Sequence, residues 1–161
     1  MAAKNKYSVE QFIALTRNYI VFQYSVSRVL PSLTMAQAII ESKYGNSAPG
    51  NNLFGMKGRY NGQSQLLKTK EWDAKQKKYI EVMAEFRKYP SWDHSISDHA
   101  WLFCRLARYK NLLGCKDYRQ ACKNVQADGY ATSPTYADTL IKTIEKYQLY
   151  KLDQEAFRLY G

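Results

Sequence analysis

A glutamate near the end of an apolar, helix-like segment is the first residue that could do acid–base chemistry. Glu41 follows the apolar residues 38–40 and precedes Gly45, which we expect to end the helix. The negative end of the helix dipole and the loss of hydration would both raise the pKa of its carboxyl group, as a general acid requires. Gln37, one turn earlier, is placed to hydrogen-bond Glu41. By position alone, a surface glutamate that closes an ordinary helix is the simpler interpretation.

The histidines and cysteines indicate no second kind of chemistry. No serine or cysteine stands in a nucleophile motif near His94 or His99, and we expect His99 to be a helix residue with a structural hydrogen bond. The cysteines are odd in number and lack the paired spacing of a zinc site: Cys104, Cys115 and Cys122. We therefore expect synthesis in a reducing compartment and no metal, cofactor or redox role. Cys104 lies in the apolar stretch 100–106, which predicts that it is buried.

Helical patterns position Glu41 in the first part of the chain. Ser8 opens a capping-box pattern, and the apolar spacing behind it predicts a helix that reaches the mid-twenties. Pro31 suits a helix start, so a second helix is expected over residues 31–44, with Glu41 in its last turn. Turn residues dominate residues 46–62, which predicts a loop.

A β-hairpin is expected in the middle of the chain, because the strand-like residues 65–72 and 79–86 flank a polar stretch. Helical spacing then returns from Ser95 in three segments: residues 95–106, 118–125 and 134–147. The expected fold is therefore mainly α with one small β-hairpin lobe.

The length and composition suit one compact domain over residues 1–161, since 45% of the residues are hydrophobic. No run approaches the about 18 apolar residues of a membrane helix, so no membrane insertion is expected. Residues 1–7 lack the hydrophobic stretch of a signal peptide. This predicts synthesis in the cytoplasm and another export route, unless the chain is a piece excised from a longer protein.

The charge balance favours anionic partners. Lys and Arg outnumber Asp and Glu by 24 to 14, which gives a formal net charge of +10. Long-range attraction would draw the chain to nucleic acid or to a bacterial cell wall. The basic residues are scattered rather than gathered in a tail, so a solvated surface explains them equally well.

Several motifs in register resemble the glucosaminidase domains of bacteria, glycoside hydrolase family 73. Residues 36–47, AQAIIESKYGNS, are similar to the family signature AQAxxES-x-[WY]-G-x-S, and residues 51–58, NNLFGMKG, to the NNLFGIKG segment after it. Residues 129–137, GYATSPTYA, resemble the GYATDPNYA motif. Residues 86–100 are similar to the segment that leaves the hairpin. The resemblance spans about residues 8–149, nearly the whole chain.

The resemblance implies a lysozyme-like fold and a peptidoglycan endo-β-N-acetylglucosaminidase, which cleaves the β-1,4 bond between N-acetylglucosamine and N-acetylmuramic acid. It implies that Glu41 is the catalytic acid. Glu71, on the first strand, matches the second acidic residue, a base for water or a stabiliser of the oxocarbenium-like transition state. A solvent-facing strand carboxylate is an equally good interpretation of Glu71, and the preferred one for Glu81 and Glu85.

Further residues of these motifs are candidates for substrate contacts. Tyr130 matches the tyrosine of the GYAT motif, where its hydroxyl could orient the acetamido group or the reacting water; a buried core tyrosine is the alternative. Saccharides pack on aromatic rings and pair with amides, so sugar subsites are expected at three residues that could equally serve packing: Asn52, Phe54 and Tyr136. Ser133 replaces the family's usual aspartate, but it can still cap a helix that begins at Pro134.

Three other functions stay open. A muramidase or lytic transglycosylase could use the same fold and a lone glutamate. A non-catalytic wall-binding module would keep the cleft, although Glu41 argues against it. A basic nucleic-acid-binding domain would explain the charge, yet no recognised nucleic-acid motif is present. We expect a monomer that acts on peptidoglycan glycan strands in the cell wall, as a phage lysin, an effector or an excised domain.

Overall fold

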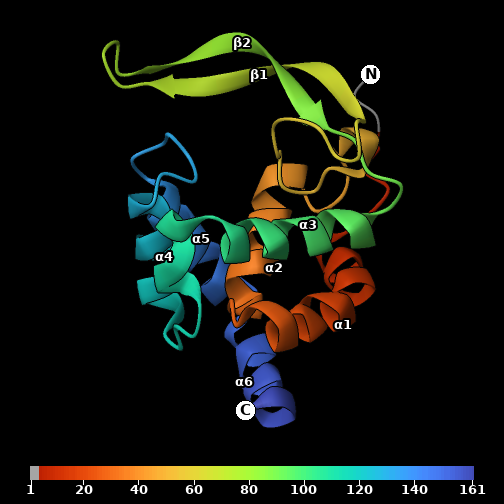
Figure 1. The fold of residues 1–161 in the computed structure, drawn as a ribbon, viewed down its shortest axis with the longest axis vertical. Helices are drawn as coiled ribbons and strands as arrows, with labels where there is room; N and C mark the ends of the chain where they lie inside the picture. Colours follow the sequence, from red (N-terminus) through yellow and green to blue (C-terminus); the bar gives the residue numbers. More distant parts are fainter. Residues whose placement is uncertain (1–3) are drawn as a thin grey trace.

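The computed structural model describes residues 4–161, so residues 1–3 of the N-terminal segment discussed above lie outside it. Its helices, here called the helical lobe, are α1 (Val9–Ser27), α2 (Pro31–Ser42), α3 (Trp92–Arg105), α4 (Tyr118–Ala127), α5 (Tyr136–Lys146) and α6 (Tyr150–Tyr160). Short 3-10 segments cover η1 (Pro49–Asn51) and η2 (Ala107–Leu112), and the strands are β1 (Ser64–Asp73) and β2 (Lys78–Arg87). The hairpin lies across one end of the helical lobe, and α6 lies at the other (Figure 1).

Helix α2 runs through the middle of the helical lobe (Figure 1) and packs against α1, α4, α5 and α6. Nearly every residue of α2 is buried. Pro31 occupies the first turn as expected, and no side chain at the N-cap position caps the helix. Instead, Asp153 of α6 accepts hydrogen bonds from Ser32, at 2.8 Å from the backbone N–H and 2.6 Å from the hydroxyl. Helix α6 thus supplies the cap that α2 lacks.

The end of α2 differs slightly from the prediction. The helix ends at Ser42, because Lys43 already adopts a left-handed conformation with φ of 50°. Glu41 still lies in the last turn. At Gly45, where φ is 85°, a Cβ atom would come within 2.8 Å of the Trp92 ring. The turn after α2 therefore requires glycine both for its backbone and for the close approach of α3.

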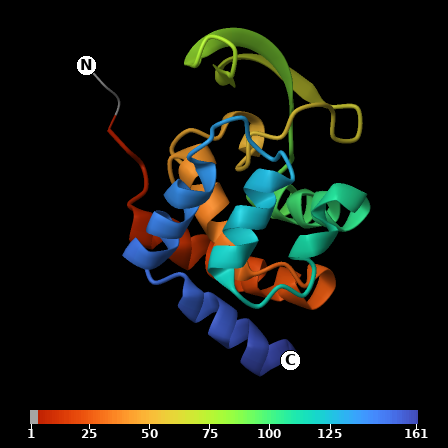
Figure 2. The same ribbon diagram turned by 90° about the vertical axis from the view of Figure 1, so that its left-hand side faces the viewer.

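The hairpin has the expected position, and each strand is one residue longer at both ends than predicted. The strands pair antiparallel, with Glu71 opposite Ile80. Leu67, Thr69 and Glu71 share the half-buried face of β1, whereas the intervening residues are exposed. The hairpin curves over the helical lobe (Figure 2), so its half-buried face is the one turned toward the helices.

Two expectations about α3 are wrong. The helix begins at Trp92, because Ser91 caps it, and ends at Arg105, so Leu106 lies outside it. Cys104 is exposed rather than buried. The buried side of α3 repeats at helical spacing and includes Ile96, His99, Ala100 and Phe103, which leaves position 104 on the opposite side.

The last part of the chain also differs from the prediction. Helix α5 begins at Tyr136, and Ser133 does not cap it; the Ser133 hydroxyl accepts from the Thr135 N–H in the preceding turn. Helix α6 was not expected, because its buried face contains the acidic Asp153 between Leu152 and Ala156 and breaks the apolar pattern. Among the described helices, none combines the length and hydropathy of a membrane span.

Candidate active site

A cleft of about 550 Å³ lies between the hairpin and the helical lobe. Its charged residues are Glu41, Lys57, Lys68, Lys70, Glu71, Arg87 and Arg108. At the far end of β1, the Trp72 N–H donates to Thr132 Oγ1 at 3.1 Å. The tip of the hairpin therefore contacts the loop between α4 and α5, and its base contacts α3, so the hairpin spans the cleft with contacts at both of its ends.

Part of the surface of Glu41 is open to the cleft. Its carboxyl group is nevertheless surrounded mostly by protein atoms. The loss of hydration raises the pKa of that carboxyl to about 7, and a hydrogen bond from the Tyr136 hydroxyl opposes part of the rise. The adjacent Gly55 adds no side chain; a Cβ there would lie 3.7 Å from Glu41 Oε2. Near neutral pH, Glu41 can therefore carry a transferable proton in an accessible place.

Three buried side chains form a hydrogen-bonded chain behind Glu41. Gln37 Nε2 donates to the Tyr136 hydroxyl at 3.1 Å, and Gln37 Oε1 lies 2.8 Å from His99 Nε2. Burial lowers the pKa of His99 to about 3, so the imidazole is neutral and its Nε2–H donates to Gln37. The expected hydrogen bond from Gln37 to Glu41 is absent within residues 4–161, because the amide is used by Tyr136 and His99. His99 is the structural helix residue that the sequence predicted.

Two tyrosines lie near Glu41 in different surroundings. Tyr130 and Tyr136 stack with their ring centroids 5.9 Å apart. Tyr136 is buried, hydrogen-bonds Gln37 and Glu41, and does not itself border the cleft. Tyr130 borders the cleft, and its buried hydroxyl has no hydrogen-bond partner within residues 4–161. This hydroxyl therefore has unused hydrogen-bonding capacity, but almost none of its surface is open to the cleft in this structure. Burial raises the pKa of both tyrosines, so both stay protonated.

Glu71 borders the same cleft from the hairpin side. Its carboxylate forms an ion pair with the ammonium group of Lys57, and both side chains are partly open to solvent. Lys57 belongs to the loop after α2, and this loop pairs with β2: the Gly58 N–H donates to the Glu85 carbonyl oxygen and the Arg87 N–H to the Met56 carbonyl oxygen, both at 2.9 Å. The ion pair therefore connects β1 to a loop that is itself bound to the hairpin. Glu81 is exposed, and Glu85 pairs with Arg59, as expected for carboxylates outside the site.

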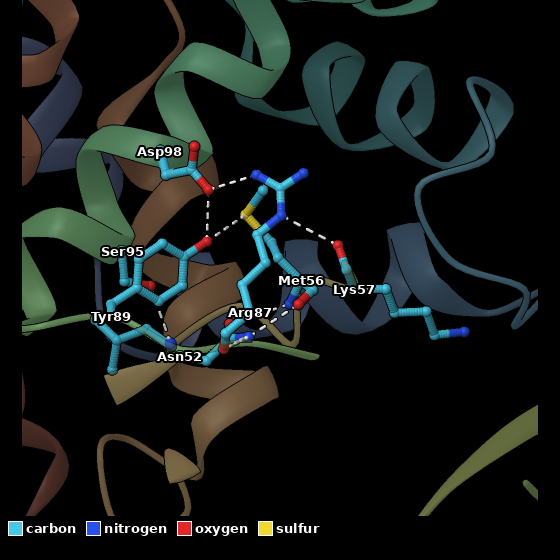
Figure 3. A network of polar contacts seen from close by, with 8 residues as sticks. Asn52, Met56, Lys57, Arg87, Tyr89, Ser95 and Asp98 are labelled. Atoms are coloured by element: carbon cyan, nitrogen blue, oxygen red, sulfur yellow. Dashed lines mark hydrogen bonds and ion pairs between the residues drawn. The ribbon is translucent and has the colours of Figure 1, made fainter. Parts of the chain in front are cut away.

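A buried network fixes the backbone of Lys57 (Figure 3). Asp98 of α3 accepts from Arg87 Nη1 and from the Tyr89 hydroxyl, each at 2.6 Å. Arg87 Nε donates to the Lys57 carbonyl oxygen at 3.1 Å. Burial and, after it, the neighbouring Asp98 carboxylate raise the pKa of Tyr89, which therefore remains a donor. The base of the hairpin is thus held by charged hydrogen bonds to α3.

Asn52 and Phe54 border the cleft but are engaged within the protein. Asn52 Nδ2 donates to the carbonyl oxygens of Met56 and Arg87, both at 2.9 Å, and Oδ1 accepts from the Met56 N–H. Phe54 stacks on His99 with ring centroids 3.9 Å apart. This geometry favours a role in shaping the cleft over direct sugar contacts.

Sequence reasoning missed the cations of the site, Lys57, Arg87 and Arg108. Lys57 stands inside the NNLFGMKG segment, which could have singled it out. The position of Arg87 depends on its pairing with Asp98 in a different element, for which the sequence carries no local signal.

Comparisons with known proteins agree on one family. The family model described as mannosyl-glycoprotein endo-beta-N-acetylglucosaminidase matches residues 19–149. Exo-glucosaminidase LytG of Bacillus subtilis is 43% identical over 139 residues, which cover 81% of this chain and 49% of LytG. A probable N-acetylmuramidase of Lactococcus lactis subsp. lactis is 35% identical over 133 residues, 76% of this chain and 30% of that protein. The chain thus spans half or less of these relatives.

A solved structure agrees with the sequence comparisons. The catalytic domain of the autolysin Auto from Listeria monocytogenes superposes with a TM-score of 0.77 and is 32% identical, covering 95% of this chain and 91% of that one. A helical lobe and a hairpin around a cleft, with one glutamate whose pKa lies near neutrality, define a lysozyme-like glycoside hydrolase. Within this class, the chain belongs to the glucosaminidase family. The fold and the family expected from the sequence are confirmed.

Proposed function

We propose that this chain cleaves the glycan strands of peptidoglycan, as an endo-acting enzyme, at the β-1,4 bond between N-acetylglucosamine and N-acetylmuramic acid. The observation that carries the proposal is Glu41, a carboxylic acid with a pKa of about 7 in an accessible cleft with a second carboxylate. The relatives named as a glucosaminidase, a muramidase and an autolysin support a glycan strand of the cell wall as the substrate.

In this proposal Glu41 protonates the oxygen of the leaving sugar while the bond to the anomeric carbon breaks. Gln37 and Tyr136, packed behind Glu41, hold the helix end and the carboxyl in place. The unpaired hydroxyl of Tyr130 orients the acetamido group of the substrate or the reacting water.

Two routes then complete the reaction. In the first, Glu71 takes a proton from water as the water attacks the anomeric carbon, and the configuration inverts. In the second, the acetamido oxygen of the substrate attacks the anomeric carbon as the leaving sugar departs, water then opens the cyclic intermediate at the same carbon, and the configuration is retained. Glu71 shares its carboxylate with Lys57, so the first route also requires room for water beside that ion pair.

The decisive test is product analysis on purified peptidoglycan. Digests are reduced with borohydride and examined by mass spectrometry. An N-acetylglucosaminidase leaves reduced N-acetylglucosamine at the new ends, and long fragments appear early if the enzyme is endo-acting. Reduced N-acetylmuramic acid would identify a muramidase, the second candidate that the Lactococcus relative favours. Anhydro ends would identify a lytic transglycosylase, and early release of only the terminal sugars would identify exo action, as in the name of LytG.

We also propose that residues 1–161 form one catalytic domain that acts at the wall as a monomer. The buried core draws on all six helices of the helical lobe, which supports one folding unit. Light scattering during gel filtration tests the oligomeric state. Steeply salt-dependent DNA binding without glycan cleavage would support the nucleic-acid alternative instead.

A further inference from the structure

Two of the cations that border the cleft are compensated within the protein. Lys57 pairs with Glu71, and Arg87 pairs with Asp98. Arg108 also borders the cleft, and it forms no ion pair with any residue in the described part of the chain. It therefore brings a positive charge without an ion-pair partner to the side of the cleft opposite the hairpin.

The lysine side chains of β1 point less directly into the cleft than Arg108 does. Lys68 and Lys70 alternate with the cleft-facing residues of the strand, among them Glu71. Side chains alternate between the two faces of a strand, so these lysines border the cleft while their side chains point to the exposed face of β1. Arg108 is thus the cation best placed to meet a ligand inside the cleft.

Arg108 is exposed, and its guanidinium has one contact that orients it. Its guanidinium lies over the ring of Tyr109, 4.8 Å from the centroid, and Tyr109 itself is buried. Gly129, with φ of 84°, lies beside it; a Cβ there would be 3.8 Å from Arg108 Nη1. Asp128, whose charge acts on the same tyrosine, accepts from Asn111 at 3.0 Å and does not pair with Arg108. The guanidinium thus rests on a buried ring, and its donors stay available to a ligand.

We propose that Arg108 binds a carboxylate of the substrate and gives the cleft a preference for anionic glycan strands over a neutral polymer of N-acetylglucosamine. A guanidinium matches a carboxylate through two parallel hydrogen bonds, and its position here costs little further ordering on binding. The inference rests on the proposed function and specifies its substrate. Peptidoglycan offers this group from two sources: the lactyl carboxylate of N-acetylmuramic acid where the stem peptide is removed, and the carboxylates of the stem peptide where it is present.

The test compares three substrates: a neutral N-acetylglucosamine oligomer, amidase-treated strands with free lactyl groups, and uncross-linked strands with stem peptides. Wild type, Arg108→Gln and Arg108→Lys are measured on each. Arg105→Gln is the matched control, because Arg105 is an exposed arginine at the end of α3 that does not border the cleft. Both kcat and KM are determined, and an inhibition constant replaces KM where the oligomer is cleaved slowly.

We expect Arg108→Gln to lower kcat/KM about tenfold on the strands that carry the recognised carboxylate, mainly through KM, with a smaller loss on the neutral oligomer. The strand type with the larger loss identifies the source of the carboxylate. Arg108→Lys should lose less, and added salt should reduce the wild-type preference.

An equal loss on all three substrates, or no loss on any, would overturn the role of Arg108. A wild-type chain that cleaves none of the strands would instead refute the proposed function. Calorimetric binding of the same strands to wild type and Arg108→Gln would then decide the role of Arg108 independently.

Discussion

The two carboxylates that border the cleft are held by different kinds of interaction. Glu41 ends a helix that is buried almost throughout, and other buried side chains pack behind it. Glu71 stands on a two-stranded hairpin. Its carboxylate pairs with Lys57 of a loop bound to β2, and a hydrogen bond from Trp72 to Thr132 connects the tip of the hairpin to the loop between α4 and α5. Burial makes a side-chain position costly to change, whereas an exposed ion pair contributes only about 0–1 kcal/mol. The helical side of the cleft thus fixes the carboxyl group of Glu41, whereas the carboxyl group of Glu71 on the hairpin side can change position more easily.

The largest effect is expected for Glu41→Gln, which keeps the size of the side chain and removes the transferable proton. We expect hydrolysis of purified peptidoglycan to fall by about 10²–10⁴-fold. The fold should persist, because the amide has no charge to desolvate. A pKa raised by folding means that ionisation of Glu41 costs stability as the pH rises through 7, so the melting temperature of the variant should not fall below that of wild type above pH 7.

Near wild-type rates of hydrolysis for Glu41→Gln would show that Glu41 is not the catalytic acid. Turbidity of wall suspensions measures the rate, and circular dichroism monitors the fold of the same samples.

Glu71→Gln should give the second largest effect if Glu71 is the base. A loss of about 10²-fold and an inverted first product are expected on that route. Proton NMR of the anomers early in the reaction provides the measurement. A retained product with a small loss would assign the attack to the acetamido group and leave Glu71 a supporting role. That outcome would show that the rate depends strongly on Glu41 of the helical lobe and only weakly on Glu71 of the hairpin.

Lys57→Met should have a smaller effect, because it removes the ion pair and keeps most of the side-chain volume. We expect a loss of about fivefold or less in kcat/KM, the range of an exposed ion pair, and weaker dependence on salt than in wild type. Arg59→Met is the matched control, since its partner Glu85 lies outside the cleft. A loss as large as that of Glu71→Gln would show that the hairpin carboxylate is as tightly constrained as Glu41.

The smallest effect is expected for Tyr136→Phe, as a shift in the pH dependence of kcat. If Glu41 is the proposed acid, only its protonated form is active, so kcat should decrease as the pH rises above about 7. The Tyr136 hydroxyl lowers the pKa of Glu41 by hydrogen-bonding its ionised form. Tyr136→Phe should therefore raise this pKa and move the alkaline limb to higher pH. Tyr118→Phe, which loses a hydroxyl bonded to the exposed Glu145, should leave the limb in place; a downward shift in Tyr136→Phe would contradict the assignment.

Local patterns were sufficient for the parts of the molecule that depend on neighbours in sequence. The capping box at Ser8, the proline start of α2 and the alternation of the hairpin predicted their elements within one or two residues. They also placed Glu41 in the last turn of its helix. Cys104 was misplaced because an apolar stretch does not reveal which side of a helix faces the core.

Contacts between distant segments lay beyond the sequence. Gln37 was expected to bond Glu41 four residues away, but His99 and Tyr136 compete for its amide from other helices. The sequence left the amide of Asn52 open to a sugar contact or to packing, and main-chain groups occupy it here. In both cases a buried polar group takes the partner that tertiary packing supplies, because an unpaired one is costly.

The hydrogen bonds from Ser32 to Asp153 bear on where the boundary of this domain is drawn. The family match ends at residue 149, whereas Asp153 lies in the first turn of α6, just beyond it. A fragment trimmed to the matched region would keep every residue that borders the cleft. It would nevertheless lose the side chain that caps the helix bearing Glu41, together with the apolar face of α6 that covers the core. An expression clone that preserves the folded enzyme must therefore extend through α6.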